Sequence, residues 1–156
     1  MSNIVRWAVA IVLAVFLIGI GAMKFAGAHI FQFIEAKATA NSLPLADLFH
    51  PAINYAVGGA EIVAGLLILI PATRMLGGLI GTAVIAGAIA FHLSPFIGMD
   101  YLGIATPTGF ADGAAAPWEL NDFVPADPAE YSPMLFIIAV VMFLVSLINL
   151  ALSRKA

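Results

Sequence analysis

The sequence predicts an all-α polytopic membrane protein, a bundle of four transmembrane helices with both termini in the cytoplasm. Hydrophobic residues make up 63% of its 156 residues, which is more apolar surface than a soluble domain of this size can bury. Charged residues make up only 10%, against roughly a quarter in soluble domains. Four apolar runs each reach about 20 residues, the length that a helix needs to cross the hydrocarbon core.

The four runs set the expected boundaries of the helices, which belong to a single membrane domain over residues 1–156. The transmembrane helices are expected at about 4–26, 52–70, 75–97 and 133–152, with outer loops at 27–51 and 98–132. The first run is too long for the apolar part of a signal peptide, and three further spans follow it. We therefore expect it to stay in the membrane as a helix.

The distribution of Lys and Arg predicts the orientation, because these residues stay on the cytoplasmic side. Arg6 lies at the start of the first run, Arg74 separates the second from the third, and Arg154 and Lys155 follow the fourth. Loop 98–132 contains no Lys or Arg but six acidic residues. This pattern places the termini inside and both long loops on the periplasmic side of a bacterial inner membrane.

The two outer loops differ in character. In the first loop, Ile30, Phe33, Ile34 and Lys37 fall near one side of a helix. This spacing is compatible with a short amphipathic helix in the membrane interface, and an ordered connector packed against the bundle is the favoured alternative. The second loop has no helical period and is expected to be irregular. Its acidic and aromatic residues predict a docking surface for a partner at Asp112, Trp118, Glu119 and Asp122.

Small residues predict how the helices pack, since lipid supplies no hydrophobic drive between helices and close contact depends on small side chains. The first three runs contain glycines, including Gly19, Gly59 and Gly87, and the third contains Gly77-x-x-x-Gly81. The fourth run has none, with Ser146 and Asn149 as its only internal polar residues. We expect the first three helices to pack tightly and the fourth to face lipid or a partner.

Three ionisable residues fall within the spans, where each charge is costly without a partner or a purpose. Lys24, Glu61 and His92 all belong to the outer half of the bundle. An ion pair between Lys24 and Glu61 would relieve both desolvation penalties, with His92 as a third member. Asn54 shares a helix face with Glu61 and extends this polar cluster toward the outer surface.

Several interpretations of the cluster stay open. The pair can be a folding device that fixes helix register, with His92 bonded to a nearby backbone. It can instead line a pocket for a quinone or another small ligand, or serve proton or ion movement. His29, His50 and His92, all near the outer interface, suggest a metal or haem site. Haem is disfavoured, because no two of these histidines have a motif spacing and the chain has no Cys.

The first three helices contain the segments Phe16-Leu-Ile-Gly-Ile-Gly-Ala-Met-Lys-Phe, Gly59-Ala-Glu-Ile-Val-Ala-Gly-Leu-Leu-Ile-Leu, the Thr73-Arg74 turn and Ala90-Phe-His-Leu-Ser-Pro. These segments resemble the DoxX family and the related YkgB-type membrane proteins. The resemblance implies a four-helix membrane bundle, an association with redox biology or oxidative stress, and Lys24 and Glu61 as a recurrent polar pair. It implies no catalytic mechanism. Loop 98–132 departs from the family pattern, which favours a specialised role in docking an external partner.

The sequence therefore favours a small membrane subunit or accessory of a quinone-linked or redox system, a non-catalytic subunit rather than an enzyme by itself. The alternative is a structural or assembly protein without ligand chemistry, and a small transporter or channel ranks lowest. The expected partners are the lipid bilayer and either another protein or further copies of this chain, with no nucleic acid.

Overall fold

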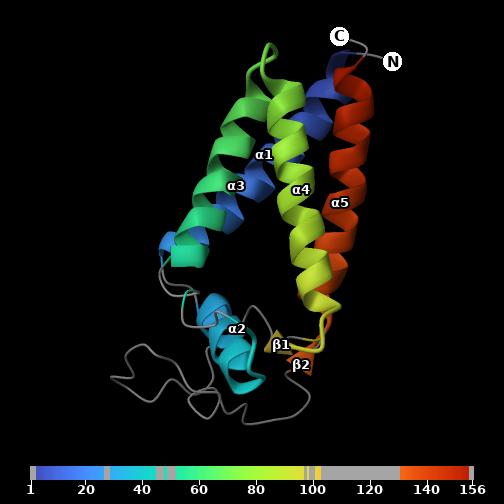
Figure 1. Ribbon diagram of the computed structural model, residues 1–156. Helices are drawn as coiled ribbons and strands as arrows, with labels where there is room; N and C mark the ends of the chain where they lie inside the picture. Colours follow the sequence, from blue (N-terminus) through green and yellow to red (C-terminus); the bar gives the residue numbers. More distant parts are fainter. Residues whose placement is uncertain are drawn as a thin grey trace.

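The computed structural model describes residues 3–26, 29–44, 48, 52–96, 98, 101–102 and 131–154. Its long helices α1 (Asn3–Phe25), α3 (Asn54–Leu69), α4 (Arg74–His92) and α5 (Met134–Ser153) run alternately up and down in a bundle (Figure 1). At one end, here called the loop end, lie α2 (His29–Ala40) and two short antiparallel strands, β1 (Tyr101–Leu102) and β2 (Tyr131–Ser132). At the other, the terminal end, lie both chain termini and the α3–α4 turn.

The all-helical bundle is confirmed, and two boundaries are corrected. By length and composition α1, α4 and α5 could each cross a membrane. The second span was expected at about 52–70, whereas α3 has only 16 residues, about 24 Å at 1.5 Å per residue. A turn follows the helix, and in it the Thr73 hydroxyl donates to Leu67 O at 2.9 Å. The third expected span also ends early, at His92, where the Ser94 hydroxyl donates to Phe91 O at 2.6 Å.

Large apolar side chains cover the outside of the bundle. Ile11, Val15, Leu66, Leu79 and Leu144 each expose between 46% and 65% of their surface. In water such a surface would be costly, because burial of apolar area is the main favourable term in folding. A bilayer solvates it directly, so this exterior is compatible with contact with lipid.

Glycines bring α1, α3 and α4 into close contact. A Cβ at Gly77 would lie 2.6 Å from Ala64 O of α3, and one at Gly81 would lie 2.7 Å from the Leu17 side chain of α1. The expected contact through Gly77-x-x-x-Gly81 is therefore present. No neighbouring atom lies within 4 Å of the Cβ positions of Gly19, Gly59 and Gly87, so these three glycines do not bring helices together.

The expectation that the fourth span faces lipid more than the others was wrong. In the 18-residue apolar stretch of α5, 28% is buried, the same share as in α1 and α4. A stripe at helical spacing turns inward and consists of Ala139, Met142, Ser146, Asn149 and Leu152. Ala and Ser are small enough for close contact without glycine, and the Thr82 hydroxyl donates to Ser146 Oγ at 3.0 Å. The helix α5 therefore packs inward through small and polar side chains.

The segment after α1 is helical and packs against the loop end. Phe33, Ala36 and Ala38 of α2 are buried, and their partly buried neighbours include Phe91 of α4 and Leu135 of α5. The helix ends before Pro44, since Ser42 adopts a left-handed φ of 55°. The favoured expectation of an ordered connector is met, with a short helix as its form.

Asn41 ties the end of α2 to the end of α4. Its Nδ2 donates to Lys37 O and to Phe96 O, both at 2.8 Å. In the Asn41→Asp variant a carboxylate would replace this donor and face two carbonyl oxygens. We expect α2 to open more readily by about 1 kcal/mol, the net value of a typical hydrogen bond, which hydrogen exchange across α2 would show as faster exchange. Ser42→Gly, which only relaxes the left-handed φ, is the control, and unchanged exchange in Asn41→Asp would contradict the expectation.

Candidate functional site

Lys24 of α1 and Glu61 of α3 form a buried ion pair. Lys24 Nζ lies 2.9 Å from Glu61 Oε1 and 2.7 Å from Oε2. The two side chains are only 9% and 8% exposed. Among the described residues, no other side chain donates to the Glu61 carboxylate. Both charges are therefore compensated inside the protein, by each other.

Two glycines position this pair. A Cβ at Gly21 would lie 2.6 Å from Gly58 O, and one at Gly58 would lie 3.2 Å from Lys24 Cβ. The backbones of α1 and α3 thus approach closely one turn away from the pair. Small residues permit such an approach between apolar helices, and it lets the Lys24 ammonium reach the carboxylate from the neighbouring helix.

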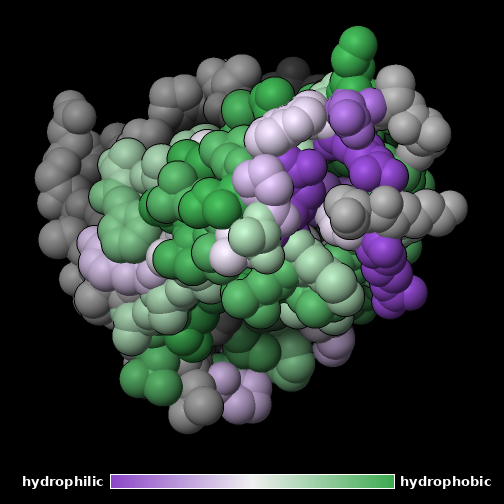
Figure 2. All heavy atoms as spheres, turned by 90° about the horizontal axis from the view of Figure 1, so that it is seen from above, coloured by the Kyte–Doolittle hydropathy of each residue, from purple (hydrophilic) through white to green (hydrophobic). Residues whose placement is uncertain are grey.

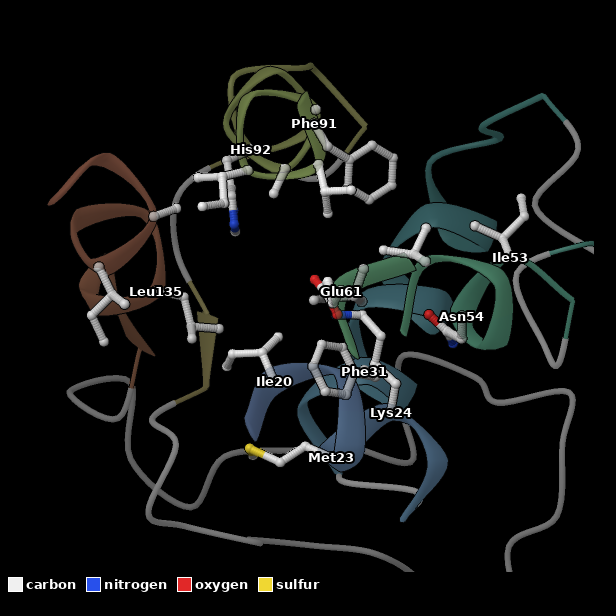
Figure 3. A pocket seen from close by; sticks show the side chains of 18 of the residues that line it. Ile20, Met23, Lys24, Phe31, Ile53, Asn54, Glu61, Phe91, His92 and Leu135 are labelled. Carbon is white, nitrogen blue, oxygen red and sulfur yellow. The ribbon is translucent and has the colours of Figure 1, made fainter. Parts of the chain in front are cut away.

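The pair faces a cavity of about 400 Å³ at the loop-end half of the bundle (Figure 3). All four long helices and α2 contribute to its walls, and most of the lining is apolar. The polar side chains among the lining residues are Lys24, Asn54, Glu61 and His92. The cavity is therefore an apolar chamber with a small number of hydrogen-bonding groups.

His92 reaches the cavity from the last residue of α4, and its ring projects into it (Figure 3). The residue is 8% exposed and its ring meets Phe136 edge-on, with centroids 6.0 Å apart. It also makes a hydrogen bond with the backbone of Gly98. His92 thus shares the cavity with the ion pair, and the backbone bond expected of a structural histidine is also present.

Asn54, the first residue of α3, lines the cavity at the loop end of that helix. Asn54, Gly58 and Glu61 follow at intervals of four and three residues along α3, which puts them on one side of the helix. Gly58 faces α1, and both Asn54 and Glu61 contact the cavity. The polar stripe predicted on this helix is present over these three residues.

Other predicted site residues cannot be placed. The side chain of His29 and all of His50, Asp112, Trp118, Glu119 and Asp122 lie outside the described residues. Within the described part of the chain, no group of three or more His, Asp or Glu residues is arranged to hold a metal ion. The hypotheses of a metal or haem site and of a docking surface on loop 98–132 stay predictions.

One neighbour of the pair was missed by sequence reasoning. Phe31 of α2 lies with its ring centroid 4.3 Å from Lys24 Nζ, within the range of a cation–π interaction. Phe31 and Ile34 both line the cavity. Their spacing of three residues was the available signal, but it does not reveal that α2 folds over the bundle.

Fold and cavity together define a bundle of membrane-compatible helices that enclose an ion pair beside an apolar chamber. No family model matches this chain, and the searches of curated proteins and of solved structures found no match either. The resemblance to the DoxX family therefore stays a prediction based on the quoted segments.

Proposed function

We propose that this protein is a small subunit of a redox system in the bacterial inner membrane, and that its cavity binds a quinone. The observation that carries the proposal is the apolar cavity of about 400 Å³ with the Lys24–Glu61 pair and His92 in its wall. Ligand sites typically measure roughly 300–1,000 Å³ and combine apolar walls with few polar groups. The size and the lining both agree with that class of site.

The polar groups suit a ligand that accepts hydrogen bonds. Lys24 has three N–H donors and directs two contacts at Glu61, so one donor is left for a carbonyl oxygen of the ligand. His92 can donate or accept through its ring. Glu61 holds the ammonium in place and is the candidate for relaying a proton when the quinone is reduced. The apolar walls of the cavity would pack against the quinone ring and the first part of its isoprenoid tail.

The proposed setting follows the charge pattern. Both termini and the α3–α4 turn lie at one end of the bundle (Figure 1), as required if Arg6, Arg74 and Arg154 stay in the cytoplasm. The cavity then opens toward the periplasmic half of the membrane. The acidic loop 98–132 would dock the redox partner, since the chain has no Cys and needs a bound molecule or a partner for electron transfer.

A structural role of the Lys24–Glu61 pair is the second candidate, and it is favoured by the contacts of Lys24 with both carboxylate oxygens. Lys24 and Glu61 satisfy each other inside the bundle, as a folding device would. The variant that carries Lys24→Met and Glu61→Leu separates the two functions. It removes both charges together and leaves no buried charge without a partner.

The test is purification from the native host in mild detergent, followed by extraction and spectroscopy of bound molecules. We expect wild-type protein to carry a quinone at near one per chain. The double variant should fold but retain about tenfold less, since a hydrogen bond to a charged group contributes roughly 1.5–3 kcal/mol. Wild-type protein without a quinone, or equal retention by the folded double variant, would overturn the proposal.

A further inference from the structure

Arg74 lies buried at the terminal end of the bundle, far from the cavity lining. It is 9% exposed, and its Nε donates to Ile68 O of α3 at 3.0 Å. Its guanidinium carbon lies 4.1 Å from the ring centroid of Trp7 in α1, which satisfies one face of the group. From the sequence alone, this residue served only to predict the orientation of the chain in the membrane. In the structure it is buried.

No acidic side chain is available to Arg74 from the segments that form the terminal end. All nine Asp and Glu residues fall within 35–61 and 100–130, and among the described helices Glu61 is paired with Lys24. Among the described residues, the other charged side chains of the helix ends at this side are the cations Arg6 and Arg154. A buried charge without a counter-charge is strongly unfavourable, so the position of Arg74 favours an anionic partner.

Hydrogen-bond donors at this place lack acceptors. Among the described residues, the side chain of Arg74 makes one hydrogen bond, from Nε to Ile68 O. Its Nη2 is buried and has no acceptor there. Nδ2 of Asn149 in α5 is likewise enclosed and unpaired among the described residues. It lies 2.9 Å from the Cβ position of Gly78, one turn along α4 from Arg74. Unpaired buried donors are therefore present on both α4 and α5.

The start of α4 contributes further hydrogen-bond donors without acceptors. Thr73 makes no side-chain cap, because its hydroxyl donates to Leu67 O instead. The first N–H groups of α4 have no acceptor within the helix, and the positive end of the helix dipole lies beside Arg74. Buried guanidinium and helix start together favour a ligand with anionic oxygens.

We propose that Arg74 and the start of α4 bind a phosphate group, that of an anionic phospholipid headgroup. Arg suits phosphate because its guanidinium is always charged and donates charge-assisted hydrogen bonds to anionic oxygens. At the terminal end, hydrophilic side chains gather toward one edge of the face, beside hydrophobic ones (Figure 2). This site is independent of the cavity and of the proposed quinone.

The test is thermal unfolding of the full chain in nonionic detergent, stripped of lipid, with three additions in parallel. Phosphatidylglycerol should raise the Tm of the wild type by about 5 °C near saturation. Inorganic phosphate tests a free ion as the source, and chloride at equal ionic strength tests screening alone. A response to inorganic phosphate without added lipid would assign the site to the free ion, and a response to lipid alone to the headgroup.

Two variants make the result specific. Arg74→Met removes the buried charge, so it should unfold at or above the wild-type Tm without lipid and lose the lipid-induced shift. Arg154→Gln, which removes an exposed charge from the same end, should keep the shift. The proposal is overturned if the wild type responds to none of the additions, if chloride reproduces the shift, or if Arg74→Met responds as the wild type does. Loss of the shift in Arg154→Gln would equally contradict it.

Discussion

Glu61→Leu alone is expected to destabilise the bundle by about 3–5 kcal/mol, the cost of breaking a buried ion pair. The Lys24 ammonium would stay at 9% exposure with the Phe31 ring as its remaining described contact. Lys24→Met should cost a similar amount, because it strands the carboxylate. Both single variants are therefore expected to accumulate to lower levels in the membrane than the wild type.

The double variant Lys24→Met with Glu61→Leu is the matched control, since apolar side chains of similar size often replace a buried pair at little cost. Its stability should lie much closer to that of the wild type than either single variant does. Thermal unfolding of the four proteins in one detergent measures the coupling between the two sites. Additive losses, with the double variant the least stable, would contradict the pairing.

Gly77→Ala is the second change with a large expected effect. Its added methyl group would lie 2.6 Å from Ala64 O and 2.7 Å from Ile68 N, and both are backbone atoms that no rotamer change can move. The helices α3 and α4 would have to separate, at a cost of about 1–3 kcal/mol for overpacking. We expect a clearly lowered Tm.

Gly87→Ala on the same helix is expected to have the opposite sign. No atom lies within 4 Å of its Cβ position, and Ala is favoured over Gly in a helix interior by roughly 0.5–1 kcal/mol. Circular dichroism at increasing temperature, in matched detergent, compares the two variants directly. Equal Tm values for Gly77→Ala and Gly87→Ala would show that α3 and α4 do not approach as closely as described.

The helical bundle could be predicted because the four apolar runs are long and nearly free of charge. The ends of the helices could not, since they depend on individual side chains. Thr73 and Ser94 both donate to carbonyl groups of the preceding turn, which closes α3 and α4 before their apolar runs finish. Hydropathy does not register such bonds. It likewise does not show that α5, without glycine, packs through Ala139 and Ser146.

The partnership of Lys24 and Glu61 could be anticipated, because a bilayer leaves an isolated charge few alternatives. The cavity beside them could not, since it depends on how the helices cross and on α2 folding over the loop end. Arg74 shows the converse case. Its position between two apolar runs predicted only the side of the membrane on which it lies. The contacts with Trp7 and with Ile68 O become available only once three helices meet.

Binding of a short-chain quinone to the protein in lipid nanodiscs tests the central claim most directly. Ala88 and Ala90 are both exposed on α4, but only Ala88 is among the described residues that line the cavity. Calorimetric titration should give saturable binding to the wild type and an unchanged Kd for Ala90→Phe. Ala88→Phe, which places a ring at the cavity, should weaken binding by about tenfold or more, equivalent to roughly 1.4 kcal/mol. No binding to the wild type, or equal binding by both variants, would contradict a ligand in this cavity.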